Sequence, residues 1–232
     1  MPTLIFHGHA CWEMQGEHRL LIDPFLSGNP VADVGPEHFD TLDAILLSHG
    51  HGDHIGDAEQ IARATGALIV ANYEIASHFG DKGLDTHAMH IGGGCHFPFG
   101  FVKLTIAHHG STGPNGEALG SPTGIILHAD GKRVYHAGDT GVFLDMQLIA
   151  ELNGPFDAAL LPIGDNYTMG IDDAVKATEF IGARMHLPMH FGTFPQIDVD
   201  AQEFQRKAAA VGQAVTVLEP GGRYAIPRAA VP

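Results

Sequence analysis

The sequence predicts an α/β fold in which two mixed β-sheets lie together with helices on their outer sides. The first part of the chain carries short apolar segments separated by glycine-containing turns, which is typical of antiparallel hairpins. Later segments alternate between helical periodicity and short apolar runs, which is typical of helices packed on a sheet. No Ser/Pro-rich linker, charge run or low-complexity tract divides the chain, so we expect one domain covering residues 1–232.

The first half of the chain predicts mostly strands. Apolar segments at 4–6, 10–14 and 19–22 indicate hairpin strands, and the continuous run 42–47 is typical of a strand buried on both faces. Helical periodicity begins near residue 55 and ends at Gly66, a common helix stop. The next elements, in order, are predicted to be a strand at 67–71, a short helix to about residue 79, and strands at 87–91, 101–107, 123–128 and 133–136. The glycines at 92–94 favour a flexible loop.

In the second half, each predicted helix precedes a predicted strand. The pairs are helix 143–152 with strand 158–161, helix 171–181 with strand 185–188, and helix 201–211 with strand 215–218. A last hairpin is expected to end near Ile226.

Composition excludes several classes of protein. With 44% hydrophobic and 17% charged residues, the chain can bury a core, so it is neither disordered nor a coiled coil. A net charge of −15 argues against binding to nucleic acid or to anionic membranes, which need basic patches. We find no basic leader and no apolar run of about 18 residues, and expect a cytoplasmic protein without membrane insertion. Cys11 and Cys95 cannot form a disulfide framework.

Histidine is frequent, with 17 residues against four tyrosines and one tryptophan. Histidine is the commonest metal ligand among side chains. At the end of the 42–47 run, the segment His49-Gly50-His51-Gly52-Asp53-His54 carries three imidazoles and a carboxylate. Side chains two residues apart can point the same way, so His49 and His51 could share one ion while Asp53 and His54 face a second. This donor set suits zinc, manganese, iron or nickel.

The pattern resembles the metallo-β-lactamase superfamily, whose signature is His-x-His-x-Asp-His after a buried strand. Further matching segments occur in the family's order at 107–111 (AHHGS), 135–140 (YHAGDT) and 188–193 (PMHFGT). Within the superfamily the chain looks most like uncharacterised metal-dependent hydrolases related to ascorbate-6-phosphate lactonase, through segments at 8–10, 21–25, 29–30, 162–165 and 168–170. The resemblance implies a four-layer αββα sandwich.

The resemblance also implies the ligands of two metal ions. His49, His51 and His109 would bind the first ion, Asp53, His54 and His190 the second, and Asp139 would bridge both. Each ion then keeps a position for water, as in catalytic rather than structural sites. We expect two divalent transition-metal ions, with zinc as the preferred metal and manganese, iron or nickel as alternatives.

One assignment stays open because His108 and His109 are adjacent, and strand-like geometry directs only one of them inward. His109 is favoured, since it lies two residues after Ala107 as in the family's pattern, although Gly110 stands where family members typically carry serine. His108 is then expected beside the ligands or on the surface.

Five more residues are expected to support the site. Asp23 would brace the metal loop by hydrogen bonding, as in the superfamily, or simply form an Asp-Pro turn. His9 would lie near the substrate mouth or form a buried turn. His136 would orient a ligand, donate a proton or be a satisfied strand histidine. Asp165 and Thr168 resemble pocket-wall residues, and Asp165 could instead cap the following helix.

The predicted reaction is hydrolysis of a small lactone or a similar cyclic ester or amide. Coordination lowers the pKa of water from 15.7 towards ~7, so a hydroxide bridging two ions would attack the substrate. The candidate catalytic residues are Asp53, Asp139, His9 and His136. The basic residues closest in sequence to the motifs are Lys103 and Arg184, so a small-molecule substrate is expected rather than RNA.

Two alternatives remain at this stage. One is a phosphodiesterase acting on small-molecule or lipid-derived diesters. The other is a non-catalytic metal-binding or diiron redox protein on the same scaffold, although diiron members usually carry a fused flavin domain and a glutamate where His51 stands here. The charge of −15 does not forbid a homo-oligomer.

Overall fold

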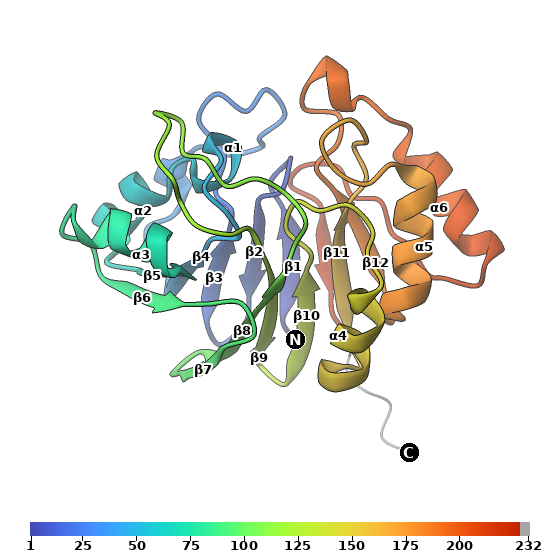
Figure 1. The fold of residues 1–232 in the computed structure, drawn as a ribbon, viewed down its shortest axis with the longest axis horizontal. Coiled ribbons are helices and arrows are strands. Elements are labelled where there is room, and N and C mark those ends of the chain that lie inside the picture. Colours follow the sequence, from blue (N-terminus) through green and yellow to red (C-terminus); the bar gives the residue numbers. More distant parts are fainter. Residues whose placement is uncertain (228–232) are drawn as a thin grey trace.

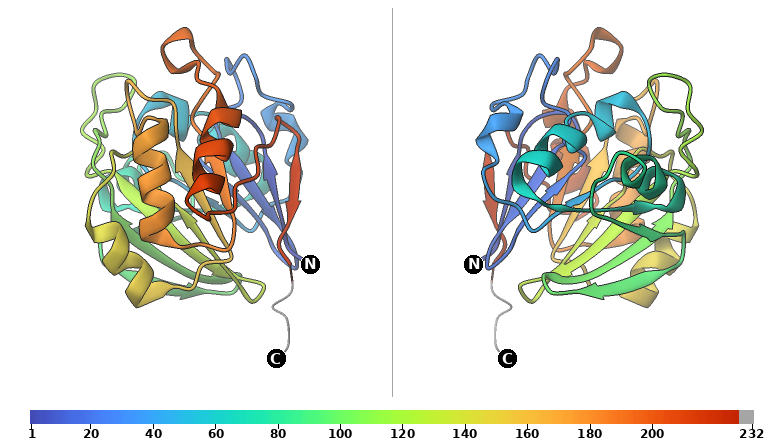
Figure 2. Two further views of the ribbon diagram at one scale, coloured as in Figure 1. Left: turned by 90° about the vertical axis from the view of Figure 1, so that its right-hand side faces the viewer. Right: turned by 90° about the vertical axis from the view of Figure 1, so that its left-hand side faces the viewer.

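A computed structural model describes residues 1–227, so residues 228–232 of the predicted domain lie outside the described residues. Two mixed β-sheets face each other, and helices cover their outer sides (Figure 1). Figure 2 shows α5 and α6 over one side of the sandwich and α2 and α3 over the other. This arrangement confirms the predicted αββα architecture.

The first sheet has the strand order β13-β1-β2-β3-β4-β5-β6. Its strands are β1 (Thr3–Phe6), β2 (Trp12–Gln15), β3 (Arg19–Ile22), β4 (Ala44–Leu46), β5 (Leu68–Asn72), β6 (Thr86–Met89) and β13 (Arg223–Ala225). The strands β13, β1, β2 and β3 pair antiparallel, whereas β3 to β6 pair parallel. Three parallel crossovers therefore follow β3, β4 and β5, and the last two carry α-helices.

The second sheet has the order β12-β11-β10-β9-β8-β7. Its strands are β7 (Gly94–Phe97), β8 (Gly100–Ile106), β9 (Thr123–Ala129), β10 (Lys132–His136), β11 (Ala158–Pro162) and β12 (His186–Met189). The strands β7 to β10 pair antiparallel, and β10 to β12 pair parallel.

Helices lie on both outer faces. The first sheet is covered by α1 (Gly52–Ile55), α2 (Ala58–Thr65) and α3 (Tyr73–Gly80), and the second by α4 (Asp145–Asn153), α5 (Ile171–Ile181) and α6 (Ala201–Ala210). Two short 3-10 helices span Pro36–His38 and Pro195–Ile197. None of the helices in residues 1–227 is long and apolar enough to span a bilayer.

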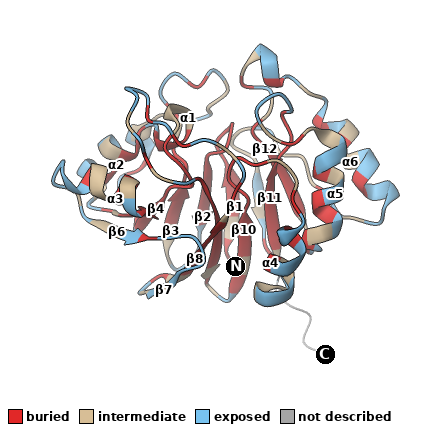
Figure 3. Ribbon diagram, in the orientation of Figure 1, coloured by how far each residue is buried: buried red, intermediate tan, exposed pale blue. Residues whose placement is uncertain are grey.

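Buried side chains that point alternately to the two faces of each strand build three apolar layers. Leu20 and Leu46 of the first sheet pack against residues of the second sheet such as Leu127 and Leu160. Their chain neighbours Leu21 and Ile45 point the opposite way, toward α2 and α3. Successive side chains of a strand point to opposite faces, so a strand buried on both sides reads as a continuous apolar run. The red strands and pale blue outer helix faces of Figure 3 show the result.

The predicted helix 55–65 is wrong in one respect, because two helices replace it. Gly56 separates them at φ 26°, and a Cβ there would overlap the Pro24 carbonyl oxygen. Asp57 then accepts hydrogen bonds from the backbone N–H groups of Leu26 and Ser27, so the break fastens the loop after β3. The predicted stop at Gly66 is confirmed, since this residue ends α2 in the left-handed conformation.

Three further expectations need correction. Gly94 begins β7, so only the first two glycines of the 92–94 triplet lie outside a strand. Residues 215–218 form a single bridge, between Val215 and His186, rather than a strand. The last strand, β13, pairs with β1 and is not part of a hairpin, because Arg223 lies opposite Ile5 across the start of the chain.

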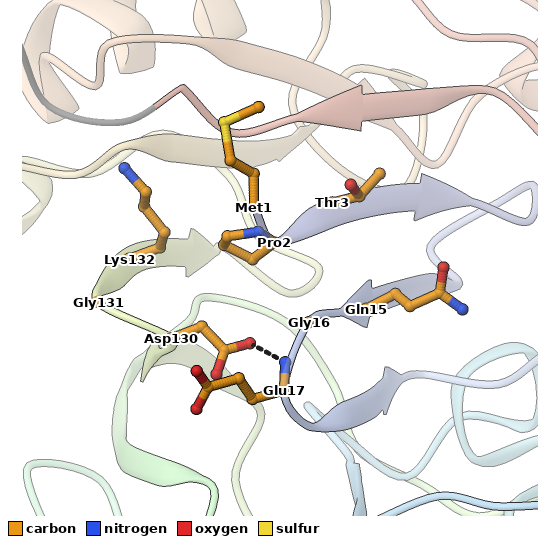
Figure 4. Close-up of a pocket in the computed structure, with 9 residues that line it drawn as sticks. All are labelled: Met1, Pro2, Thr3, Gln15, Gly16, Glu17, Asp130, Gly131 and Lys132. Carbon is orange, nitrogen blue, oxygen red and sulfur yellow. Dashed lines mark hydrogen bonds between the residues drawn. The ribbon is translucent and has the colours of Figure 1, made fainter.

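A cavity of about 800 Å³ lies at the starts of β1 and β10. Thr3, Glu17, Asp130 and Lys132 are among its lining residues (Figure 4), and Asp130 accepts a hydrogen bond from the backbone N–H of Glu17. The cavity contains none of the predicted site residues. Two of the predicted site residues, His9 and Asp139, follow the opposite ends of these two strands.

Candidate metal centre

The six-residue motif straddles the junction between β4 and α1. His49 follows β4, and His51 is the N-cap of α1, so Asp53 and His54 lie in the first turn of that helix. Gly50 permits this path, because a Cβ there would overlap Leu119. The turn therefore places His49 and His51 in one candidate ligand group and Asp53 and His54 in another, and the rings of His49 and His54 lie 4.0 Å apart.

The first candidate ligand set consists of His49, His51 and His109, whose possible ligand atoms all lie within 4.8 Å of one another. Nε2 of His49 is 3.1 Å from Nδ1 of His51. His109 comes from the loop after β8, in the opposite sheet. Of the two neighbouring histidines, His109 faces the other two imidazoles, whereas His108 is exposed and stacks on Phe143, so the geometry favours His109 as the candidate ligand.

The second ligand set brings together Asp53, His54 and His190, again within 4.8 Å, and the same group includes His9. His190 follows β12 of the second sheet and takes a left-handed backbone conformation, with φ 57°. This conformation is uncommon outside glycine. Its backbone N–H donates to the carbonyl oxygen of His9 at 2.6 Å, which fastens the loop after β12 to the first sheet.

Asp139 lies between the two ligand sets. Its Oδ2 is 3.0 Å from Nε2 of His190, 3.3 Å from Nε2 of His54, 3.4 Å from Nε2 of His109 and 3.9 Å from Nε2 of His49. Gly138 allows the preceding turn, because it has φ 64° and a Cβ there would overlap the Thr123 carbonyl oxygen. One carboxylate thus contacts imidazoles of both sets.

The residues fit a metal centre by their unpaired atoms as well as by their positions. Nε2 of His54 and Oδ1 of Asp139 are buried and lack hydrogen-bond partners among the described residues. Buried polar atoms without partners cost free energy, and native proteins seldom retain them without a ligand or a functional reason. Imidazole nitrogens with carboxylate oxygens form a donor set typical of catalytic zinc and related ions.

Electrostatics within the cluster keep the carboxylate ionised. Burial alone would raise the pKa of Asp139, but His190 and His54 hold it well below its usual range. Burial and the neighbouring His54 hold the pKa of His49 well below 6.5. For His54 burial acts in the same lowering direction, yet Asp139 and Asp23 raise its pKa well above 6.5. Since histidine binds metal as the neutral imidazole, metal binding would displace the proton from His54.

Asp23 occupies the bracing position expected for it. Its Oδ2 accepts hydrogen bonds from Nδ1 of His54 at 2.8 Å and from the hydroxyl of Ser48 at 2.5 Å, and its Oδ1 accepts from the Ser48 backbone N–H at 2.8 Å. The Ser48 hydroxyl lies 3.0 Å from Nδ1 of His49. These bonds leave the Nε2 atoms of His49 and His54 facing Asp139.

His9 differs from the expectation of a place at the substrate mouth, because its side chain is fully buried. Its Nδ1 is 2.9 Å from Oγ1 of Thr193, and its Nε2 is 3.2 Å from Oδ2 of Asp53. Burial and the nearby His190 lower the pKa of His9 to about 4, so the imidazole is neutral at pH 7. The Gly-His-Ala turn therefore packs His9 behind Asp53.

His136 is also fully buried and has partners at both ring nitrogens. Its Nε2 donates to the Ala10 carbonyl oxygen, and its Nδ1 accepts from the backbone N–H of Gly138, next to Asp139. Of the three roles considered, this geometry matches a satisfied strand histidine that shapes the Asp139 loop. It does not match a proton donor to substrate.

Asp165 and Thr168 lie in the loop between β11 and α5. Asp165 is exposed, and its backbone oxygen accepts from the backbone N–H of Thr168 at 3.0 Å. The alternative role as a helix cap is wrong, because Gly170 is the N-cap of α5 and no side chain bonds there. Met169 joins this loop to Thr140, one residue after Asp139. Contact with a substrate remains a prediction for both residues.

Several supporting residues were not predicted. The hydroxyl of Ser111 accepts from the backbone N–H of Gly50 and donates to the Leu119 carbonyl, so it fixes the turn between His49 and His51. Ser48 and Thr193 contact ligand histidines or their neighbours, as described above. Serine and threonine are common in all loops, so the sequence does not single out Ser48, Ser111 and Thr193. Only their hydrogen bonds to residues distant in sequence show that they support the site.

Aromatic side chains border the second ligand set. The rings of Phe25 and Phe194 lie 5.5 and 5.7 Å from the His9 ring, and both are half-buried. His51, Asp53 and His109 are only partly buried, so solvent reaches the centre on their side. A substrate would approach there.

Comparisons with known proteins agree with this geometry. A family model described as a beta-lactamase superfamily domain matches residues 18–191. UPF0173 metal-dependent hydrolases of Desulfitobacterium hafniense and Carboxydothermus hydrogenoformans are 54% and 46% identical, over 86% and 94% of this chain and 87% and 97% of the relatives. The structure of Igni18, a metallo hydrolase of Ignicoccus hospitalis, shows 37% identity and a TM-score of 0.87 over 96% of this chain and 97% of that one. Since the matches span most of its length, the chain belongs to the beta-lactamase superfamily and, within it, to the UPF0173 metal-dependent hydrolases.

Proposed function

We propose that this chain is a hydrolase that opens a small, neutral lactone or a similar cyclic ester or amide. The reaction would take place at a centre for two divalent ions, with zinc as the preferred metal. The observation that carries the proposal is the position of the Asp139 carboxylate, 3.0 to 3.9 Å from ring nitrogens of both ligand sets. A carboxylate shared between two sets of N/O ligands suits a pair of ions acting on one substrate.

His49, His51 and His109 would hold one ion, Asp53, His54 and His190 the other, and Asp139 would contact both. Bound ions would supply Lewis acidity toward a carbonyl oxygen and would lower the pKa of water. The chain itself orients the ligands. Asp23 and Ser48 fix two imidazole rings from behind, and the half-buried Phe25 and Phe194 limit access of water beside His9.

The distribution of cationic side chains supports a neutral substrate over a phosphodiester. Within residues 1–227, the ion pairs of lysine and arginine involve only carboxylates outside the centre, as in Lys82 with Glu59 and Arg184 with Asp157. Sites that clamp phosphate groups commonly use arginine or lysine in addition to metal ions. Arg184 and Lys103 are the basic residues nearest the motifs in sequence, and neither provides a phosphate clamp at the centre. Arg184 is paired with Asp157, and Lys103 lies in the middle of β8.

The test combines metal analysis with a substrate panel. We expect about two equivalents of transition metal per chain, and turnover of γ- or δ-lactones or cyclic amides that exceeds turnover of bis(p-nitrophenyl) phosphate. His54→Ala should abolish turnover and keep the circular dichroism spectrum, whereas His90→Ala, which removes an exposed histidine, should change neither. Turnover of the phosphodiester alone would replace the proposal by its runner-up, and a diiron absorption spectrum with oxygen reduction would replace it by a redox function. Full activity in His54→Ala would exclude the two-ion site.

A further inference from the structure

Thr193 lies behind the second ligand set, in the segment that carries His190, and the sequence assigns it no role. Its Oγ1 is 2.9 Å from Nδ1 of His9, and on the far side of that ring Nε2 is 3.2 Å from Oδ2 of Asp53. His9 is fully buried and Thr193 is 5% exposed, so bulk water does not compete for these contacts. A hydrogen-bonded chain thus runs from the loop after β12, through the β1–β2 turn, to α1.

The direction of these hydrogen bonds depends on which ring nitrogen of His9 carries the proton. A neutral imidazole carries a single ring proton, and an ionised carboxylate only accepts hydrogen bonds. The contact between His9 and Asp53 is therefore favourable when the proton is on Nε2, which leaves Nδ1 to accept from the Thr193 hydroxyl. In the other tautomer, lone pairs of Nε2 and Asp53 would face each other at 3.2 Å, and the hydroxyl could donate only to the Phe191 carbonyl oxygen, 3.4 Å away.

The backbone holds the His9 ring in this place. His9 has φ 56°, a left-handed conformation that is costly for a residue with a Cβ. Its carbonyl oxygen accepts from the backbone N–H of His190 at 2.6 Å, and the two rings are 4.1 Å apart. The turn thus keeps the imidazole between Asp53 and Thr193.

We propose that Thr193 and His9 are positioning residues of the second metal site. Thr193 fixes the His9 tautomer that carries its proton on Nε2, and His9 holds one oxygen of Asp53 so that the other is directed to the ion. The same proton keeps His9 a hydrogen-bond donor and prevents it from becoming an additional ligand, although its ring atoms lie within ligand distance of Asp53, His54 and His190. This inference rests on the proposed two-ion centre.

The experiment compares Thr193→Val, which removes the hydroxyl at nearly constant shape, with Thr193→Ser, which keeps it. Nitrogen-15 NMR of histidine-labelled, metal-free protein reports the tautomer of His9. We expect the signature of a protonated Nε2 in the native protein and in Thr193→Ser, and its loss or mixing in Thr193→Val. In zinc titrations against a competing chelator, the second equivalent should bind 10- to 100-fold more weakly to Thr193→Val, while the first is unchanged and Thr193→Ser is close to native.

The matched control is Thr178→Val, which deletes a buried hydroxyl on α5 that donates to the Val175 carbonyl at 2.6 Å. This variant should change neither the His9 signal nor zinc affinity. Thr193→Ala serves if the valine variant does not fold. An unchanged tautomer and an unchanged second affinity without the hydroxyl would overturn the inference. If the native protein itself binds only one equivalent while the tautomer responds to Thr193, the two-ion centre fails and the Thr193–His9 link stands.

Discussion

Nδ1 of His54 donates a hydrogen bond of 2.8 Å to Oδ2 of Asp23, and both side chains are fully buried. The same carboxylate reaches His49 through the Ser48 hydroxyl. His49 and His54 belong to different ligand sets, so one buried aspartate orients imidazoles for both proposed ions. Hydrogen bonds of this kind fix the tautomer and the ring orientation of a ligand histidine.

Asp23→Asn should therefore weaken the binding of both ions, by about 10- to 100-fold each. An amide has a single accepting oxygen, so its NH2 group must face either the Ser48 backbone N–H or the His54 Nδ1–H and the Ser48 hydroxyl, and the donors that it faces lose their acceptor. Chelator competition measures the two affinities, and Asp43→Asn, a change to an exposed aspartate, is the control. Affinities within about twofold of native in Asp23→Asn would contradict the bracing role.

Two further substitutions distinguish a terminal ligand from a shared one. His51→Ala removes a member of the first ligand set only, so we expect the metal content to fall from about two equivalents to about one. Asp139→Asn removes charge next to both sets and should reduce both equivalents. Elemental analysis after gel filtration measures the ratio, and equal losses in the two variants would show that Asp139 is not shared.

Gly56→Ala should destabilise the fold by about 2–4 kcal/mol, because a positive φ and an overlap with the Pro24 carbonyl oxygen act together. Gly66→Ala is the matched control. It also has a positive φ, 73°, but a Cβ there would meet nothing within 4 Å, so we expect a cost of about 1 kcal/mol. Thermal unfolding of both variants measures the difference, and equal costs would mean that the loop shifts to relieve the overlap.

The buried side chain of His186 should make the free energy of unfolding fall at acidic pH. Burial lowers the pKa of this histidine to about 4, against 6.5 for the free side chain. Below pH 6.5 the unfolded chain binds a proton at this histidine that the folded protein does not bind. The contribution of the neutral His186 to the free energy of unfolding is therefore fully present above pH 6.5 and is lost as the pH falls towards 4. The loss is about 1.4 kcal/mol per pH unit.

Urea unfolding between pH 7 and pH 4 tests this dependence. His186→Gln should flatten the decline, since it removes the group that titrates. His90→Gln removes an exposed histidine and should leave the decline as it is. A decline of equal slope in native protein and His186→Gln would assign the acid sensitivity to other buried groups.

The architecture and the grouping of the candidate ligands could be predicted because their signals are local. The run 42–47 and the histidines that follow it lie within a dozen residues, and His109, Asp139 and His190 each follow a strand with its own apolar pattern. The split at Gly56 could not be predicted, since it depends on Pro24, which is distant in sequence. Residues 215–218 are apolar like a strand, yet they pair with the second sheet only through Val215.

The supporting residues were harder to predict than the ligands for a related reason. Nothing in the sequence around Thr193 shows that it meets His9, 184 residues earlier. The positive φ angles of His9 and His190, which bring these segments together, are set by the packing of two sheets and not by local preference. Sequence patterns could therefore name the candidate ligands but not the contacts that hold them in place.

The pairing of β13 with β1 has a consequence for synthesis of the protein on the ribosome. One edge of β1 pairs with β13, at Arg223–Ala225, which is translated after every other strand of this sheet. The proposed metal centre, which includes His190, is likewise incomplete until the segment after β12 has emerged. A nascent chain can thus neither complete its first sheet nor assemble the proposed metal centre early, so translation products that end before β12 should bind less metal and be prone to aggregate.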